Sequence, residues 1–187
     1  MKQFSRIEPT TQQVCGLQYK RTMVVKTFKA DDDSVHEFTT WGKEGGRNGG
    51  VIALTPDRKV IVTYQFRAGP ERWMWEIPGG KFNGGEDEQA AALRELKEET
   101  GYEPQHVTLL GKSCRDAYCN MTWYYFLATG CTLSDDGPEL DKEERDQGAE
   151  ARLISIKELI DNAKHDRMTD PEAVLMAYEQ LNELAAA

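Results

Sequence analysis

The chain has 187 residues, a length that suits one domain with a real hydrophobic core, or one domain with a small appendage. Hydrophobic residues make up 39% and charged residues 29%, values typical of globular chains that exclude fibrous and disordered classes. No stretch approaches the about 20 apolar residues that cross a bilayer, so we expect no membrane partner. The start, MKQFSRIEPTTQQ, has no apolar run resembling a secretory signal, and we expect a cytoplasmic protein.

The formal net charge of -9 argues against sequence-independent binding to nucleic acid, whose phosphates the average surface would repel. A small anionic substrate is compatible with this charge if metal ions mediate its binding. The cysteines form no CxxC pair and no zinc-ligand spacing with histidine, so we expect reduced, mostly buried thiols. They are Cys15, Cys114, Cys119 and Cys131.

Two β-hairpins are predicted in the first third of the chain. In residues 21–41, β-branched and aromatic residues flank an Asp-rich turn. The Gly-rich segment 42–50 reads as a loop, and residues 50–66 give two apolar runs separated by the turn residues Pro56 and Asp57. Further strands are expected at residues 73–77, 106–112, 122–129 and 149–154.

Three helices are predicted, and the acidic stretch 135–150 reads as a loop. Ser155 and Glu158 have the spacing of a capping box, and Asp170 before Pro171 fits an N-cap followed by proline in the first helical position. Many strands with few helices predict an α+β fold with a sheet core flanked by helices. The expected helices cover residues 87–100, 156–166 and 171–185.

The segment 79–102, GGKFNGGEDEQAAALRELKEETGY, separates acidic from apolar residues when wound as a helix. At about 100° per residue, Glu95, Glu98 and Glu99 cover an arc of about 100°. The other side is apolar and can pack on a sheet. Its members are Ala92, Leu93 and Leu96.

Three like charges within one helical turn destabilise a helix unless a cation lies among them. Carboxylate oxygens select Mg²⁺ or Mn²⁺. Arg94 falls beside Glu98, where it can orient a carboxylate, and Gly101 can end the helix in the left-handed conformation. An ordinary exposed acidic helix has the same spacing, so periodicity alone leaves both interpretations open.

Four glycines precede this helix. Gly79, Gly80, Gly84 and Gly85 suit a loop whose backbone takes positive φ angles and approaches a ligand closely, and Glu86 follows at the helix entrance.

The full set of spacings resembles a Nudix box, in which only the aromatic Tyr102 stands where an aliphatic residue is commoner. This resemblance implies a Nudix-type α/β/α sandwich around a mixed sheet, with the box forming a loop, a helix and a loop. The matching positions are Gly80, Glu86, Arg94, Glu95, Leu96, Glu98, Glu99, Gly101 and Tyr102.

The resemblance also implies roles for residues of the box. Arg94 is expected to orient the glutamates, with Glu86 nearby, and Glu98 is a candidate catalytic residue as well as a metal ligand. The cofactor is expected to be Mg²⁺, with Mn²⁺ as the other possibility. The implied metal ligands are the carbonyl of Gly79 and the carboxylates of Glu95, Glu98 and Glu99.

A weaker likeness extends over most of the chain and is to the ADP-ribose and ADP-sugar pyrophosphatase branch. It rests on the N-terminal strand pair, on VTYQFR at 62–67 and on WEIPG at 75–79. It implies hydrolysis of ADP-ribose or a related nucleotide sugar to a nucleoside monophosphate and a sugar phosphate. It also implies an N-terminal strand extension, residues 1–46, that forms a homodimer, and a hydrolase domain over residues 47–187.

Alternatives to the hydrolysis of ADP-ribose stay open. Ala117 and Tyr118 stand where many ADP-ribose members carry a proline, and a tyrosine there is more like dinucleoside polyphosphate hydrolases. A Nudix-like sensor that binds a nucleotide without cleaving it is the alternative from another class.

The pyrophosphatase branch also takes a catalytic glutamate from a late loop, where we favour Glu143 or Glu144. The competing acids are Glu139, Glu143, Glu144, Asp146 and Glu150.

Arg67 and several aromatic residues are candidates for substrate binding. Arg67 ends a predicted strand and suits contact with a substrate phosphate, although a surface pair with Glu71 explains it equally well. Aromatic rings can stack a nucleobase, and Trp75 and Tyr118 are our choices, although each such ring also suits a core or a dimer interface. The four rings considered are Trp73, Trp75, Tyr118 and Trp123.

Overall fold

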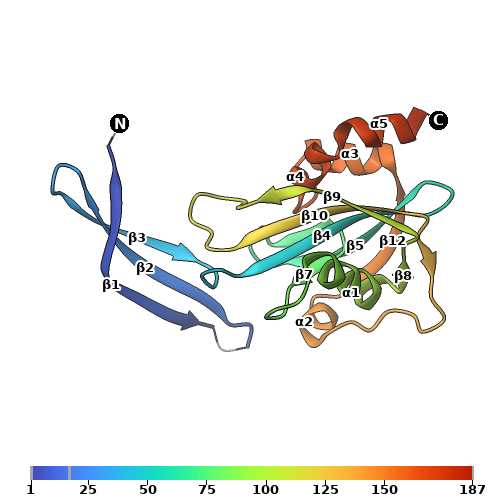
Figure 1. Ribbon diagram of the computed structural model, residues 1–187. Coiled ribbons are helices and arrows are strands. Elements are labelled where there is room, and N and C mark those ends of the chain that lie inside the picture. Colours follow the sequence, from blue (N-terminus) through green and yellow to red (C-terminus); the bar gives the residue numbers. More distant parts are fainter. Residues whose placement is uncertain (1, 17, 187) are drawn as a thin grey trace. The chain divides into compact units, whose positions relative to one another are not determined.

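A computed structural model describes residues 2–16 and 18–186, and Figure 1 shows their helices and strands. The chain forms two compact units. One contains the chain up to Gly46 together with Cys114–Thr122, and the other contains Arg47–Ser113 and the chain from Trp123 onward. Cys114–Thr122 lies in the first unit with the N-terminal strands, which the sequence did not suggest.

The first unit is built on the antiparallel sheet β1-β2-β3. The predicted hairpin is confirmed, and Asp33 in its turn has a φ of 64°. Strand β1 was not predicted, because nearly all of its side chains are exposed and its sequence therefore lacks the apolar alternation that marks a strand. The strands are β1 (Phe4–Cys15), β2 (Arg21–Ala30) and β3 (Val35–Trp41).

The second unit contains a seven-stranded sheet with the order β12-β5-β4-β10-β9, in which β6 pairs with β5 and β7 pairs with β4. All predicted strands of this sheet are present, but β4 begins at Arg47, so the expected loop over 42–50 is too long. A small separate sheet pairs β8 (Tyr102–Glu103) with β11 (Thr132–Leu133). The main strands are β4 (Arg47–Leu54), β5 (Lys59–Arg67), β6 (Arg72–Glu76), β7 (Gly79–Lys81), β9 (His106–Ser113), β10 (Thr122–Thr129) and β12 (Glu150–Ser155).

Two of the three predicted helices are confirmed, as α1 and α3, and the structure differs from the prediction in two other places. The capping box before α3 is confirmed, since the N–H of Glu158 donates to Ser155 Oγ at 3.1 Å. The helix expected over 171–185 is two helices that meet at Ala177, and the stretch expected to be loop contains α2. The helices are α1 (Glu88–Thr100), α2 (Lys142–Asp146), α3 (Ile156–Lys164), α4 (Pro171–Met176) and α5 (Tyr178–Ala186).

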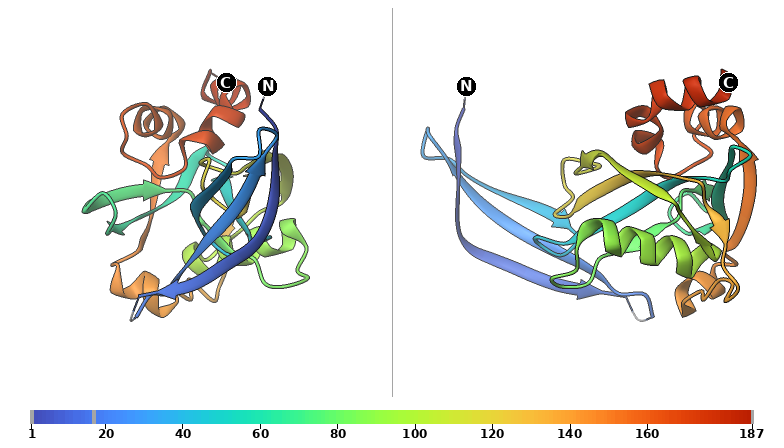
Figure 2. Two further views of the ribbon diagram at one scale, coloured as in Figure 1. Left: turned by 90° about the vertical axis from the view of Figure 1, so that its left-hand side faces the viewer. Right: turned by 45° about the vertical axis from the view of Figure 1, so that its right-hand side comes forward.

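Helices cover both faces of the seven-stranded sheet, with α1 on one side and α3, α4 and α5 on the other (Figure 2). The alternation along β5 shows how one strand serves both layers, because Ile61 packs in the cluster that contains α1 whereas Val60 and Val62 pack in the cluster that contains α3. The expected α/β/α sandwich is thereby confirmed. None of the helices that the structure describes is both long and apolar enough to span a membrane.

The thiols differ in their surroundings. Cys131 is buried, and burial raises its pKa to about 11, whereas Cys119 is half-buried. Cys15 and Cys114 are exposed, so the expectation of mostly buried thiols is wrong. Cys15 ends strand β1, in which nearly all side chains are exposed.

Candidate active site

Helix α1 is fixed to the sheet by its apolar side and presents carboxylates on the other. Ala91, Ala92 and Leu96 are fully buried against the sheet. At the start, the side chain of Asp87 accepts hydrogen bonds from two backbone N–H groups of the first turn. At the end, Gly101 takes the predicted left-handed conformation with a φ of 76°. The helix is thus held at both ends and along one face.

Three carboxylates converge beside this helix. Glu95, Glu99 and Glu144 each offer an oxygen, and the three oxygens lie within 4.8 Å of one another. Glu99 is only 6% exposed, and burial, followed by the charges of Glu144 and Glu95, raises its pKa well above the usual range. Burial also raises the pKa of Glu95 and that of Glu144. Gathering three such groups is unfavourable without a cation or bound protons between them.

Strand β7 passes close enough to α1 to touch these acids. The backbone N–H of Gly79 donates to Glu99 Oε2 at 3.2 Å. At Gly80, an added methyl group would collide with the carboxylate of Glu95 and would lie 2.7 Å from its Cδ. Both glycines are in a strand and pair with Gly50 and Gly49 of β4. They are therefore required for close approach, and not for the positive φ angles that the sequence suggested.

Arg94 connects three carboxylates of the same segment. Its guanidinium contacts Glu86 Oε1 at 3.0 Å, Glu95 Oε1 at 2.9 Å and Glu98 Oε2 at 2.7 Å. These partners raise the pKa of Arg94, and the bond from Arg94 lowers the pKa of Glu86. The arginine therefore joins the helix entrance to the acidic face of α1, which is the arrangement that an orienting residue needs.

The late loop supplies the third carboxylate of the cluster from α2. Of the two favoured acids, Glu144 lies in the cluster, and Glu143 accepts a hydrogen bond from Gln147 Nε2 at 3.1 Å. Asp146 pairs with Lys142. Helix α2 lies beside α1 in Figure 1. The sequence did carry a signal for it, because the spacing of Asp141 and Glu144 is that of a capping box.

The NUDIX domain family matches residues 46–177, which is well over half of the chain. The chain belongs to the Nudix family. The resemblance read from the box is thereby confirmed, and with it the class of enzyme, a Nudix hydrolase.

Proteins similar to this Nudix chain include two sequence relatives and one solved structure. The methanol dehydrogenase activator of Bacillus methanolicus is 32% identical over 165 residues, which cover 86% of this chain and 87% of the relative. The ADP-ribose pyrophosphatase of Bacillus subtilis (strain 168) is 33% identical and covers 73% of this chain and 74% of its own length. The crystal structure of an ADP compounds hydrolase aligns over 97% of this chain and 98% of its own, with a TM-score of 0.71 and 16% identity, and so shares the fold.

Within the Nudix box, Glu98 is placed differently from Glu95 and Glu99. Its carboxylate is bonded to Arg94, and its side chain is 42% exposed. Among the residues that the structure describes, the set of converging carboxylates consists of Glu95, Glu99 and Glu144, so Glu98 lies beside the cluster on the same helix.

Arg67 is bound to residues that the sequence did not connect with it. Its guanidinium makes two hydrogen bonds to the carboxylate of Glu76, which is 7% exposed, and a third from Nη1 to Gln147 Oε1 at 2.8 Å. The predicted alternative, a pair with Glu71, is wrong. Glu76 pairs with Thr63 across strands β6 and β5, on the sheet face that α1 covers. Arg67 is thus held near the acidic cluster.

Trp75 points to the opposite face of the sheet, because neighbouring residues of a strand alternate between faces. Its ring packs against Tyr64 with centroids 4.6 Å apart, and the guanidinium of Arg152 lies 5.7 Å from its centroid. It also packs against the core cluster that contains Val62. The structure therefore does not bring Trp75 to the three carboxylates.

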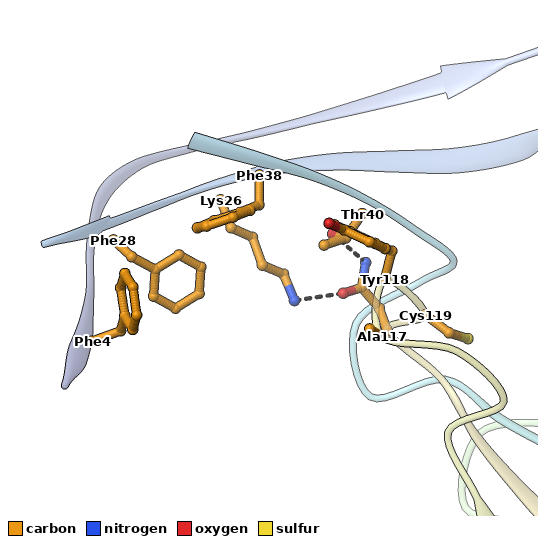
Figure 3. A pocket seen from close by; sticks show the side chains of 9 residues that line it. Phe4, Lys26, Phe28, Phe38, Thr40, Ala117, Tyr118 and Cys119 are labelled. Carbon is orange, nitrogen blue, oxygen red and sulfur yellow. Dashed lines mark hydrogen bonds between the residues drawn. The ribbon is translucent and has the colours of Figure 1, made fainter. Parts of the chain in front are cut away.

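Tyr118 belongs to the first unit, where it lines a cavity of about 390 Å³ (Figure 3). Phe4, Phe28 and Phe38 come from the three strands of the sheet, and Lys26 points from β2 toward the segment that carries Tyr118. Four of the nine lining residues are aromatic, and one, Lys26, is cationic. Lys26 is bonded to the side-chain oxygen of an asparagine of that segment, Asn120.

Proposed function

We propose that this protein is a Mg²⁺-dependent Nudix hydrolase that cleaves the pyrophosphate bond of ADP-ribose or a related nucleotide sugar. The products are a nucleoside monophosphate and a sugar phosphate. The observation that carries the proposal is the convergence of Glu95, Glu99 and Glu144, from two separate elements, at one place beside strand β7.

The donor set fits a hard divalent cation. All three groups are carboxylates, and Mg²⁺ and Mn²⁺ prefer oxygen ligands. Because burial raises the pKa of Glu99 and of Glu95, a cation in this place favours the charged carboxylates that the protein environment otherwise disfavours. When bound, such an ion neutralises phosphate oxygens and makes a water molecule more acidic. We include the carbonyl of Gly79 and the carboxylate of Glu98 as further ligands, as the resemblance to the Nudix box implies, since the N–H of Gly79 contacts Glu99 and Glu98 lies on the same helix.

The side chains around the cluster have separate tasks in this proposal. Glu95 and Glu99 hold the metal from α1, and Arg94 keeps Glu95 and Glu98 in place through its bonds of 2.9 and 2.7 Å. We assign the removal of a proton from the attacking water to Glu144, the member of the cluster that comes from α2, since its carboxylate lies beside the metal ligands of α1 and burial raises its pKa.

Arg67 is our candidate for contact with the substrate phosphate. Its guanidinium is fixed by Glu76 and Gln147, so it can present its charge without first losing conformational freedom. The side chain remains 33% exposed, which leaves part of it accessible to a ligand.

The choice of substrate is supported by the relatives. The ADP-ribose pyrophosphatase of Bacillus subtilis matches this chain over most of both lengths, and the ADP-sugar pyrophosphatase of Mus musculus is 30% identical over 115 residues. We therefore favour ADP-ribose over the dinucleoside polyphosphates to which Tyr118 pointed.

A substrate panel with product identification tests the proposal. The purified chain is incubated with Mg²⁺ and ADP-ribose, ADP-glucose or diadenosine tetraphosphate, and products are separated by ion-exchange chromatography. We expect AMP and ribose 5-phosphate from ADP-ribose. Glu99→Gln removes a buried cluster carboxylate, and Glu183→Gln on the exposed side of α5 is the matched control.

Each outcome of the panel decides between functions. Turnover of ADP-ribose that is lost in Glu99→Gln and retained in Glu183→Gln supports the proposal. Turnover of the diadenosine compound alone favours the dinucleoside polyphosphate alternative. Tight nucleotide binding without cleavage of any substrate favours the sensor and overturns the hydrolase.

The N-terminal strands are our proposed dimerisation element. Phe4 of β1 and Phe38 of β3 support this, because both are exposed and line the same cavity, and exposed apolar groups that lie together mark interaction surfaces. Sedimentation of the full chain tests it: we expect a dimer that Phe38→Asp weakens, and a monomeric wild type overturns it.

We also place the protein in the cytoplasm. Two of its four free thiols, Cys15 and Cys114, are exposed, and a reducing compartment keeps such groups reduced. Fractionation of cells that express the chain checks this location.

A further inference from the structure

Glu144 reaches the cluster from a helix that packing does not hold. Helix α2 has five residues, and none of them is buried. A helix this short is unstable alone, so hydrogen bonds to neighbouring elements must fix its position.

At the N-terminal end of α2, Glu144 forms a capping box with the residue before the helix. The N–H of Glu144 donates to Asp141 Oδ1 at 2.8 Å, and the N–H of Asp141 donates to Glu144 Oε2 at 2.6 Å. The carboxylate that enters the cluster therefore also caps its own helix. Its direction depends on where α2 lies, so a shift of the helix moves the carboxylate with it.

The C-terminal end of α2 is fixed to strand β5 by Gln147. Its backbone carbonyl accepts a hydrogen bond from the N–H of Phe66 at 3.0 Å. Its side-chain amide uses both of its functions: Oε1 accepts from Arg67 Nη1 at 2.8 Å, and Nε2 donates to Glu143 Oε1 at 3.1 Å. An amide is the side chain that can accept from an arginine and donate to a carboxylate at once.

The far end of this connection is rigid. Arg67 is held by two hydrogen bonds to Glu76, which is buried in the sheet and also accepts from Gln65 Nε2 at 3.4 Å. The path Glu76, Arg67, Gln147 and Glu143 thus runs from the sheet core to α2. Glu143 precedes Glu144 directly, so the anchor lies one residue from the cluster carboxylate.

We propose that Gln147 is a positioning residue that fixes α2 against strand β5 and thereby holds Glu144 at the metal-binding cluster. The inference rests on the proposed function, because it assigns Gln147 a role in that same site. Gln147 acts through Arg67 and Glu143 and does not itself join the three carboxylates.

Gln147→Met tests the role, since methionine has a similar length and makes neither side-chain bond. Gln147→Glu keeps an acceptor for Arg67 but replaces the amide donor beside Glu143 with a like charge. Gln180→Met, on the exposed side of α5, is the matched control. The bond from Phe66 is unaffected in all three, so we expect the variants to fold.

Three measurements are made on the full chain. Mn²⁺ binding without substrate is followed by electron paramagnetic resonance, amide hydrogen exchange is followed over residues 141–149, and kcat and KM are measured with ADP-ribose. For Gln147→Met we expect Mn²⁺ affinity and kcat to fall by about tenfold or more, the range that partners of metal-binding side chains show. Amide exchange over residues 141–149 should be faster in Gln147→Met than in wild type, and KM should change less than kcat. The Mn²⁺ affinity, kcat and exchange rate of Gln147→Glu should lie between those of wild type and those of Gln147→Met.

The outcomes separate this inference from the proposed function. If wild type and Gln180→Met bind Mn²⁺ and turn over substrate while Gln147→Met matches them in affinity, kcat and exchange, the positioning role is wrong. A Gln147→Met protein that loses only thermal stability also overturns it. If wild type shows neither Mn²⁺ binding nor turnover, the proposed function fails, and unchanged exchange in Gln147→Met then rejects the anchoring of α2 as well.

Discussion

The N–H of Gly79 donates to the carboxylate of Glu99 at 3.2 Å, so strand β7 and helix α1 meet at a side chain that is 6% exposed. A buried carboxylate with one neutral donor is a poor structural element in itself. Its place beside Glu95 and Glu144 makes sense when the three together hold a cation.

Removing the charge of Glu99 should abolish most of the activity and leave the fold intact. In Glu99→Gln the amide oxygen can still accept from Gly79, but the metal-binding charge is lost. We expect kcat to fall by about 100-fold or more, with an unchanged circular dichroism spectrum. Glu98→Gln should also lose about 100-fold if the ligand role from the family resemblance holds. Full activity in both variants would place the chemistry elsewhere.

Without metal, the stability of the protein should fall as the pH rises from mildly acidic values. The pKa of Glu99 is raised above 4.5, so between pH 4.5 and its folded-state pKa the folded protein keeps a proton that the unfolded chain has released. The free energy of unfolding therefore decreases with pH in that window. Glu44, with a pKa lowered to about 2, contributes the opposite slope only below pH 4.5.

Urea unfolding in EDTA at pH 5 and pH 8 measures this effect. Wild type should lose stability at pH 8 relative to Glu99→Gln, which has no titrating group at that position. Parallel curves for the two proteins would show that Glu99 does not hold a proton in the metal-free fold.

Metal binding should reverse this instability. A ligand that binds the folded state alone raises stability with its concentration, by about 2.7 kcal/mol at 100 times Kd. We expect Mg²⁺ or Mn²⁺ to raise the melting temperature of wild type at pH 8 in a saturable way and to have little effect on Glu99→Gln. Equal shifts in both would indicate binding at another place.

Much of the site was predictable from sequence because its parts lie within one helix. The spacing of Glu95 and Glu99, the arginine before them and Gly101 at the end all belong to α1, where local geometry fixes which side chains share a face. The pairing of Arg94 with Glu98 follows from the same geometry.

The parts that the sequence missed depend on contacts between distant segments. Glu76 and Gln147 matter because Arg67 reaches both, across 9 and 80 residues of chain. Strand β1 has almost no buried side chains, so it lacks the alternation that identifies a strand. The break between α4 and α5 at Ala177 has no glycine or proline to mark it. The prediction for Trp75 failed because the sequence does not show which face of the sheet this residue occupies.

Gly80→Ala should impair activity with little loss of stability. The added methyl group would collide with the end of the flexible Glu95 side chain, which can move aside, whereas the backbone of β7 need not change. Displacing that carboxylate by about 1 Å costs on the order of 100-fold in rate at a site built on exact placement. Gly84→Ala is the matched control, because a methyl group there meets nothing within 4 Å. We expect similar melting temperatures for both variants, and a loss of kcat and of Mn²⁺ affinity in Gly80→Ala alone. If Gly80→Ala retains wild-type kcat and Mn²⁺ affinity, Glu95 does not need the position that strand β7 leaves open for it.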